Sequence, residues 1–363
     1  MTSYWILFLV PVLALFSPIY FQGRARDFAW FSFLFISILF IGLRHQVGGD
    51  WDNYLFFSER LSREPFDIIL GSKDGGYNLL VWVSAKLGWS IYGANLFCAV
   101  VFLGGLTYFC RRQPYPLLAW IISTPYLIIV VGMGYTRQSI AVGLLCFGLI
   151  FLQEAKGWRA LASVLLATAF HKSALLLLPL GAILVTRAHL AVVRDTLRKG
   201  LVSGPILVSG LIFITLTGVV TFINADIFYA EFKSYVLSGQ WHSEGGRVRS
   251  FMNGIPAIFL LVSWRRWTEV NGDSILWFVL ALIAVIAMVV TPFLSTFSDR
   301  MGIYLIPLQI YVISRIPLLI QNEALRQGGI IGICALYGVV LFVWLNHASH
   351  AFYWLPYKSL LWH

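Results

Sequence analysis

Charged residues are scarce in this sequence. Asp, Glu, Lys and Arg make up 12% of its 363 residues, hydrophobic residues make up 59%, and the mean hydropathy is +0.80. A soluble domain carries about twice that share of charge. The apolar runs recur along the whole chain and do not form short alternating strands, which argues against an outer-membrane barrel. The sequence therefore predicts an all-α, polytopic membrane protein, because helices satisfy their own backbone groups inside the bilayer.

Several kinds of site are also missing from the sequence. It contains no P-loop, no GxGxxG between a strand and a helix, and no DxD on an inner loop, so it offers no nucleotide site. The four cysteines lie in or beside apolar runs without the spacing of metal ligands. We therefore expect no metal and no cofactor. The net charge of +10 forms no basic stripe on a soluble face, so we expect no nucleic-acid partner.

The distribution of basic residues orients the membrane spans. Arg24 and Arg26 follow the first apolar run, which places this loop inside and the N-terminus outside. Extending the rule along the chain gives about 12 transmembrane helices, with both termini outside and outer loops at about 44–76 and 224–249. Surface-lying helices are expected in the outer loops. No repeat or soluble segment is visible, so we predict a single polytopic domain over residues 1–363.

One apolar run is too long and too polar at its centre to be a single helix. Trp158 to Val185 spans about 28 residues and has His171 and Lys172 in the middle. A Lys at the centre of a membrane helix costs about 2.5–3.5 kcal/mol on insertion scales. We therefore predict two shorter helices that meet at His171 and Lys172.

The most crowded polar stretch is RHQVGGDWDNY, residues 44–54, directly after an apolar run. The pair Gly48 and Gly49 frees the backbone for a tight turn or for close approach to a neighbour. Asp50 can cap the helix that follows, because a carboxylate accepts hydrogen bonds from the first N–H groups of a helix. The plainer interpretation is an interface turn with a helix cap and an aromatic anchor.

On this topology the unusual charges gather at the outer ends of the spans, against the positive-inside trend. A single cation there can be a snorkelling side chain, but several lie beside small or polar residues, in GYTRQS, FHKS and FSDRM. We predict a cavity that opens outward and receives an anionic group, since Arg forks match phosphate geometry and Lys supplies a point charge. The charged residues at this face are Arg44, Asp50, Asp52, Arg137, His171, Lys172, Arg247, Arg249, Asp299 and Arg300.

Together these residues resemble a known family. GLRHQVGGDWDNY is similar to the signature G-x-R-x-x-x-G-x-D-[YW]-x-x-Y of the EpsG-like branch of Wzy-type polysaccharide polymerases. The Gly76-Tyr77 pair, TRQS, FHKSAL and SDRMGIY follow in the order of that family, and the tail YWLPYKSLL is also similar to it. His45 stands where a Tyr is common. The acidic residue often found just before the Gly-Tyr pair is missing there, and Asp74 is the nearest candidate.

The resemblance implies a glycosyltransferase that polymerises lipid-linked repeat units into O-antigen or exopolysaccharide. Its substrates would be glycan repeat units on undecaprenyl pyrophosphate, at the periplasmic face of the bacterial inner membrane. The implied architecture is similar to the GT-C glycosyltransferases, and a chain-length regulator is a conceivable partner. Metal is not required in this scheme, since the cations could replace Mg²⁺.

Such a reaction needs a base for the acceptor hydroxyl and cations for the departing pyrophosphate. We assign the pyrophosphate to Arg44, Arg137, Lys172 and Arg300. The candidates for activating the acceptor, or for orienting the arginines, are Asp50 and His171. A wider set of substrate-binding candidates comprises Gln138, Trp51, Tyr54, Trp241, His242, Arg247, Arg249, Asp299 and Tyr357. The aromatic rings among them, with Tyr135, suit the apolar faces of a sugar.

Two other functions remain open at this stage. A membrane O-acyltransferase would also use a His in a membrane cavity, but it predicts a cytoplasmic path for the acyl donor, whereas His171 is expected on the outer side. A lipid-linked oligosaccharide flippase, or another transporter, would also hold cations in a cavity. A transporter should show paired broken helices in repeated halves, and the sequence shows none.

Overall fold

The computed structural model describes residues 1–17, 23–71, 74–154, 156–177, 245–272 and 275–362, together with Tyr229. Within these residues the chain is helical, and its one extended pairing is an isolated bridge between Arg44 and Ser359. Six described helical segments are long and apolar enough to cross a membrane. They are α2 (Gly23–Gly42); α6 (Ser90–Cys110); α7 (Pro116–Ser123) continued by η1 (Thr124–Val131) and α8 (Gly132–Gly134); α9 (Thr136–Gln153); α17 (Ser295–Ile313) with η4 (Ile316–Leu319); and α18 (Glu323–His347).

The chain is therefore a polytopic helical membrane protein, as predicted. Three shorter apolar helices accompany the six segments: α1 (Thr2–Phe16), α10 (Gly157–Phe170) and α16 (Ile275–Val290). The expected span at 201–223, and most of the expected outer loop at 224–249, lie outside the described residues. The total of about 12 spans stays a prediction.

The chain divides into two compact units. The first consists of Met1–Cys146, Ala169–His171 and Ile310–His363, and the second of Phe147–Thr168 and Lys172–Gln309. The division runs through the helices α9, α10 and α17 and between His171 and Lys172. Folding as a single domain stays a prediction.

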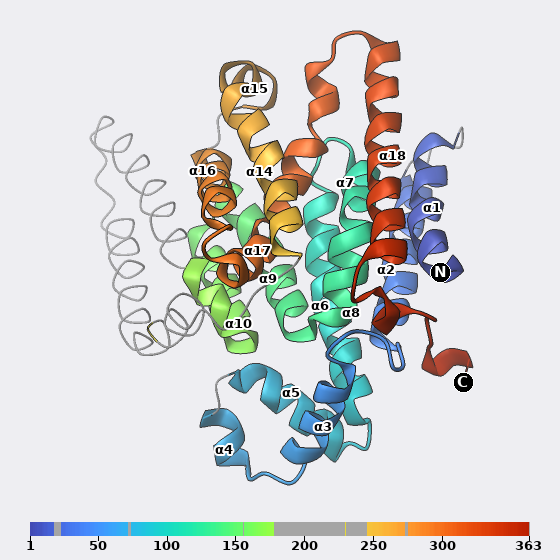
Figure 1. Ribbon diagram of the computed structural model, residues 1–363, viewed down its shortest axis with the longest axis vertical. Coiled ribbons are helices and arrows are strands. Elements are labelled where there is room, and N and C mark those ends of the chain that lie inside the picture. Colours follow the sequence, from blue (N-terminus) through green and yellow to red (C-terminus); the bar gives the residue numbers. More distant parts are fainter. Residues whose placement is uncertain are drawn as a thin grey trace. The chain divides into compact units, whose positions relative to one another are not determined.

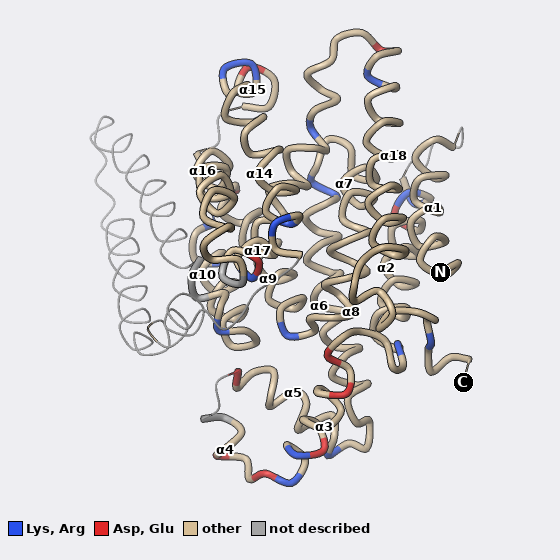
Figure 2. The backbone as a smooth tube through the Cα atoms, in the orientation of Figure 1, with Lys and Arg blue, Asp and Glu red and all other residues tan. Residues whose placement is uncertain are grey.

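The first unit is a bundle of long helices with a group of short helices at one end (Figure 1). In the bundle, α2 packs on α6, and α1 and α18 pack on α7. The short helices are α3 (Trp51–Leu61), α4 (Phe66–Gly71) and α5 (Gly75–Lys86), and both α3 and α5 pack on α6. Figure 2 shows charged residues clustered on this short-helix group, while the middle of α6 is free of them.

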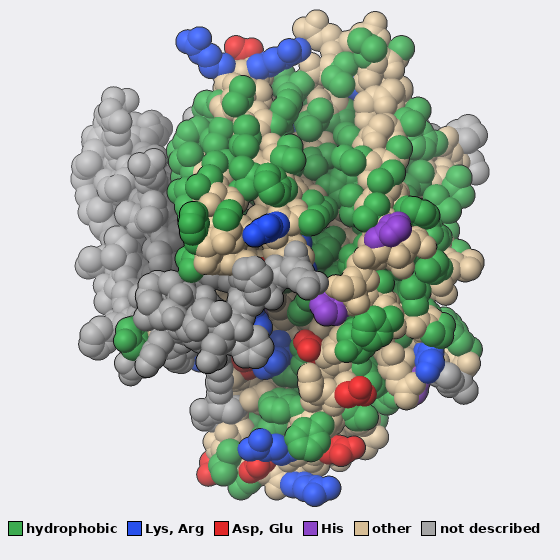
Figure 3. All heavy atoms as spheres, in the orientation of Figure 1, with side chains coloured by type: hydrophobic (Ala, Val, Ile, Leu, Met, Phe, Trp, Pro, Cys, Tyr) green, Lys and Arg blue, Asp and Glu red, His purple; other side chains and the backbone are tan. Residues whose placement is uncertain are grey.

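The helix α3 is amphipathic, as the sequence predicts for a surface-lying segment. Trp51, Tyr54 and Leu61 point into a buried cluster that they share with Tyr77 of α5, because residues three, seven and ten positions apart fall on one helical face. The opposite face carries exposed charged side chains such as Arg60, and charged side chains dot the surface of α3 and α4 in Figure 3.

The bundle is tightest where α6 meets α9. A Cβ atom on Gly105 would collide with the backbone of Gly143, and one on Gly143 would collide with the backbone of Phe102. Small residues let helix backbones approach closely inside a membrane, where packing drives helix association. This contact holds α9 against α6, and the first turn of α9 carries the TRQS motif.

In the second unit, α14 (Gly246–Val262) packs on α16, and α15 (Trp264–Asn271) follows α14. Buried hydrogen bonds join these helices, because Thr291 donates to Ser250 Oγ at 2.7 Å and Asn253 donates to the Gly302 carbonyl at 2.8 Å. The apolar run in the sequence predicts a span from Ile275 to Thr296, but α16 ends at Val290.

Two predictions about chain breaks have different outcomes. The predicted break at His171 and Lys172 is confirmed, because α10 ends at Phe170 and the 3-10 helix η2 (Lys172–Leu177) begins two residues later. The sequence also predicts that Asp299 and Arg300 lie in a turn between two spans, and this prediction is wrong, because both residues lie inside α17. The turn lies earlier, between α16 and α17, because α17 already begins at Ser295.

Candidate functional site

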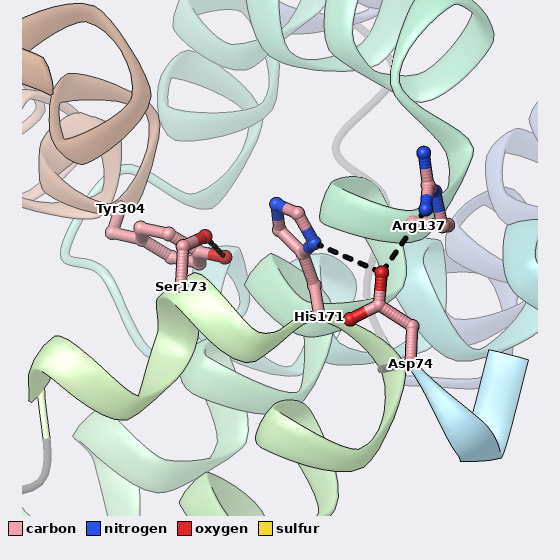
Figure 4. Close-up of polar contacts among 5 residues, drawn as sticks. All are labelled: Asp74, Arg137, His171, Ser173 and Tyr304. Carbon is pink, nitrogen blue, oxygen red and sulfur yellow. Dashed lines mark hydrogen bonds and ion pairs between the residues drawn. The ribbon is translucent and has the colours of Figure 1, made fainter. Parts of the chain in front are cut away.

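A buried carboxylate in the first unit brings two predicted site residues together (Figure 4). Asp74 Oδ2 accepts a hydrogen bond from Arg137 Nη1 at 3.0 Å, and the same oxygen lies 3.8 Å from His171 Nδ1. The distance between Asp74 and His171 is longer than a hydrogen bond. The two side chains form an ion pair when the imidazole is protonated. We call Asp74, Arg137 and His171 the carboxylate cluster.

Three elements supply this cluster, and local sequence explains how they meet. Asp74 precedes α5, Arg137 lies in the first turn of α9, and His171 follows the last residue of α10. A Cβ atom on Gly76 would lie 2.9 Å from the carbonyl oxygen of Ala169, so α5 can come this close to the end of α10 only with a glycine there. The glycine of the Gly-Tyr pair thus allows the Asp74 carboxylate to lie near the His171 imidazole.

Arg137 is oriented by the protein and still reachable. Its Cζ atom lies 5.7 Å from the ring centroid of Tyr54 and 5.9 Å from that of Tyr77, within cation–π range. Burial raises the pKa of both phenols above its ordinary value, so the two rings are neutral partners of the guanidinium. The Arg137 side chain remains 40% exposed, whereas that of Asp74 is 4% exposed. An anionic group can therefore approach a guanidinium that is already held in place.

Arg44 lies next to this cluster in a different role. It is 1% exposed, and it donates to the Thr136 hydroxyl at 2.7 Å, to Asn95 Oδ1 at 3.3 Å and to two carbonyl groups near its own position in the chain. Burial lowers the pKa of its guanidinium, and these acceptors stabilise the charged form. Arg44 thus ties the end of α2 to the residue before Arg137, and its own surface is covered by protein.

The glycine pair before Asp50 makes the close approach that the sequence predicts. Gly48 has φ +108°, and a Cβ atom there would lie 2.5 Å from the Met133 carbonyl oxygen. Asp50 stands at the N-cap position of α3, but its carboxylate does not cap the helix. Its charge acts on Tyr54, the ring that also contacts Arg137. The plainer interpretation of Asp50 as a helix cap therefore does not describe this structure.

The other candidates of the first unit are mostly buried. The rings of Trp51 and Tyr54 belong to the core, and Gln138 is 4% exposed. Tyr357 stacks on Phe40 with ring centroids 4.0 Å apart and donates to the Phe40 carbonyl at 2.8 Å. These residues pack within the protein and present little surface to a substrate.

The second unit has its own polar group. Arg249 forms an ion pair with Asp299, and Ser173 hydrogen-bonds Tyr304 at 2.9 Å (Figure 4). The remaining candidates in this unit are Lys172, which begins η2 and is partly buried, and Arg247 and Arg300, which are exposed. Trp241 and His242 lie outside the described residues.

Sequence reasoning did not assign Asp74 to the site. The signal was present, because an acidic residue is expected just before the Gly-Tyr pair, but here an extra Gly separates the two. Asp74 still reaches the cluster because it precedes the first turn of α5. As for metals, no group of three or more His, Cys, Asp or Glu side chains suited to bind one was found in the described part of the chain.

The fold and the carboxylate cluster define a multi-pass helical membrane protein with an ion-paired, partly exposed guanidinium at Arg137. The model of the EpsG family matches residues 27–359, so the chain belongs to the EpsG family. This membership indicates a polysaccharide polymerase-type role. No curated protein and no solved structure matches the chain, so the similarity to GT-C glycosyltransferases stays a prediction.

Proposed function

We propose that the protein is a Wzy-type polymerase that joins undecaprenyl-pyrophosphate-linked repeat units by glycosyl transfer at the periplasmic face of the inner membrane. The observation that carries this proposal is the carboxylate cluster, in which a half-exposed Arg137 is held by a buried Asp74 beside His171. Such a reaction needs a prepared cation for the leaving group and a nearby base. A chain-length regulator is a further partner in this proposal.

The reaction balances without a further reactant. The bond between C1 of the growing chain and its lipid pyrophosphate breaks, and C1 forms a bond to a hydroxyl oxygen of the new lipid-linked unit. The hydroxyl proton passes to the base, and the lipid pyrophosphate leaves as an anion. Arg137 is placed to stabilise that anion, because a guanidinium makes two parallel hydrogen bonds to phosphate oxygens.

His171 suits the base better than Asp74 does. Asp74 pairs with Arg137, and a neighbouring cation stabilises the ionised carboxylate and makes it a poor proton acceptor. The Nδ1 atom of His171 faces Asp74, which orients the ring so that Nε2 points away from the carboxylate (Figure 4). A carboxylate that orients an imidazole also stabilises the imidazolium formed in the reaction. Asp50, whose charge acts on Tyr54, is the second candidate.

The remaining cations take supporting roles in this proposal. Arg44 positions Thr136 and through it the first turn of α9, so it acts on the pyrophosphate indirectly. Lys172 follows His171 directly in the sequence and is kept as a candidate pyrophosphate ligand. Arg300 is exposed on α17 and is kept as a candidate for the second lipid-linked substrate.

The test is polymerisation by the purified protein in liposomes that contain lipid-linked repeat units. We expect the native chain to make a ladder of longer glycans with no nucleotide sugar. Arg137→Ala should lower the rate by about 10²–10³-fold, the effect of removing one preorganised stabilising group. Arg137→Lys should recover only part of it, since Lys cannot form the fork.

Arg112→Ala is the matched control, because Arg112 is exposed and lies over the Tyr108 ring beyond the far end of α6. It removes the same charge and should leave the ladder unchanged. If the native protein moves lipid-linked units across the bilayer but never elongates them, the chain is a flippase and the proposal is wrong. Normal elongation by Arg137→Ala would disprove the role of that residue.

A further inference from the structure

An exposed aromatic surface lies on the segment that follows α18. Phe352 is 62% exposed and Tyr353 is 42% exposed, although both are large hydrophobic side chains. Their ring centroids lie 4.0 Å apart, and the exposed His350 ring stacks on that of Tyr353 at 6.4 Å. The three neighbouring rings form one surface, which we call the aromatic platform (His350, Phe352 and Tyr353).

The backbone beneath the aromatic platform is firmly held. Trp354 is 3% exposed, donates its indole N–H to the Ile129 carbonyl at 3.1 Å, and accepts a hydrogen bond at its own carbonyl from the Tyr4 hydroxyl at 2.7 Å. The Gly48 N–H donates to the Tyr353 carbonyl at 3.0 Å. Rings on a fixed backbone can bind a ligand with little further loss of conformational freedom.

The aromatic platform adjoins the loop that carries Asp50. A Cβ atom on Gly49, the residue before Asp50, would lie 3.6 Å from Tyr353 Cδ2. Lys358 donates to Gln46 Oε1 at 2.8 Å in the same loop. Hydrophobic and acidic side chains lie close together on this face in Figure 3. The loop that approaches Tyr353 thus carries a carboxylate at Asp50 and an amide at Gln46 that holds the Lys358 ammonium.

The segment after α18 also packs against the backbone that precedes Arg137. A Cβ atom on Gly134 would lie 2.6 Å from Trp354 Cζ2, so the indole lies directly against the backbone three residues before Arg137. The platform and the carboxylate cluster therefore both belong to the first unit and are joined by a short, buried path. The segment that carries the platform is therefore packed against the backbone that leads into Arg137.

We infer that the aromatic platform binds sugar rings of the lipid-linked glycan, by stacking them on Phe352 and Tyr353. A pyranose presents an apolar C–H face to an aromatic ring and hydroxyl groups to polar residues at the rim, which is the chemistry found here. Trp51 and Tyr54, which the sequence suggested for this role, are buried and cannot stack on a sugar. This inference rests on the proposed function. The competing interpretation is an aromatic anchor at the membrane interface.

The experiment separates stacking from anchoring by the shape of the replacement. The probe is the oligosaccharide released by mild acid from the lipid-linked repeat units of the producing cell. Binding to the protein in nanodiscs is measured by saturation-transfer NMR with titration. The double variant Phe352→Leu/Tyr353→Leu keeps apolar side chains for the interface but has no rings. We expect it to bind the probe about tenfold more weakly, the size of a favourable aromatic contact.

Two controls accompany the double variant. Phe352→Trp/Tyr353→Phe keeps both rings and should bind like the native chain. Phe342→Leu removes a ring that is 50% exposed near the C-terminal end of α18, and it should have no effect on binding. Equal melting temperatures of all variants confirm that each is folded.

The outcomes distinguish this inference from the proposed function. Native-like binding by the double Leu variant, or no binding by the native chain, overturns the aromatic platform as a sugar site. If the native chain binds the probe through these rings but never elongates lipid-linked units, the proposed polymerase activity fails while the sugar site stands. If both hold, the double Leu variant should also raise KM for the lipid-linked substrate while kcat changes little.

Discussion

Asp74 shares one carboxylate oxygen between a guanidinium and an imidazole. Its side chain is nearly inaccessible, while those of its two partners are more exposed, so it acts on a substrate through Arg137 and His171. A buried charge without partners would be costly, and here both neighbours can offset that cost. Asp74 is therefore a positioning residue in the proposed reaction.

This role predicts the effect of Asp74→Asn. The amide keeps an oxygen for Arg137 but loses the charge, so both partners shift, and a misplacement of about 1 Å can cost roughly 10²-fold in rate. Asp67→Asn is the matched control, since Asp67 is exposed on α4 and should tolerate the same change. Rates are measured in the liposome assay over a range of pH.

The pH profile separates positioning from simple structural support. Asp74→Asn removes the charge that faces His171 Nδ1, so the dependence of the rate on pH should differ from that of the native chain. A lower rate with an unchanged profile would argue against the pairing with His171. A native rate would remove Asp74 from the site altogether.

The residues also show what one sequence can and cannot predict about this site. The proximity of the Arg44 motif to TRQS was predictable, because both follow span ends on one side, and the Arg44–Thr136 hydrogen bond confirms it. That Arg44 is buried was not predictable, since burial depends on Asn95 and on carbonyl groups whose positions follow from packing. The platform rings were missed because their exposure depends on how the tail docks.

At the scale of elements, a pair of adjacent glycines in α6 offers a direct test of the helix packing. Gly105 faces the backbone of Gly143 in α9, whereas a Cβ atom on Gly104 would meet nothing within 4 Å. Gly105→Ala should lower stability by about 1–3 kcal/mol, the usual cost of overpacking. Gly104→Ala should be neutral or stabilising by up to about 1 kcal/mol, since Ala favours a helix over Gly.

Thermal unfolding of both variants in the same detergent measures this difference. The two substitutions add the same methyl group to neighbouring residues of one helix. The change in helix propensity and the depth in the membrane are therefore closely matched. Equal melting temperatures would show that α6 and α9 do not make the contact described here. Because α9 begins with Thr136 and Arg137, Gly105→Ala should also lower polymerisation.

Elements were predicted well where the pattern was long and less well where it was short. The sequence predicts spans at Phe28–Leu43, Trp89–Cys110 and Arg137–Leu152, and the structure has α2, α6 and α9 there, because apolar runs and flanking charges define them. Hydropathy does not fix whether a shorter run crosses the bilayer. The 15 residues of α1 extend only about 22 Å as a helix, against a hydrocarbon core of about 30 Å.

At the scale of the whole molecule, the sequence predicts which side of the membrane each end of the first unit faces. The C-terminal segment pairs with the Arg44 loop through the bridge to Ser359, so both lie at the same end of the bundle. The other end holds Gln113, which receives a hydrogen bond from Arg315. A helix of 25 residues, α18, runs between the two ends and is about 37 Å long.

The last prediction is therefore one of sidedness. Glu59→Cys, exposed on α3, should react with a membrane-impermeant maleimide in intact cells, while Gln321→Cys, exposed before α18, should react only after lysis. The four native cysteines are buried, so the native chain gives a low background. The positive-inside trend motivates this orientation, because Arg111, Arg112 and Arg315 lie toward the Gln321 end. The reverse labelling pattern would place the carboxylate cluster on the cytoplasmic side and rule out polymerisation at the periplasmic face.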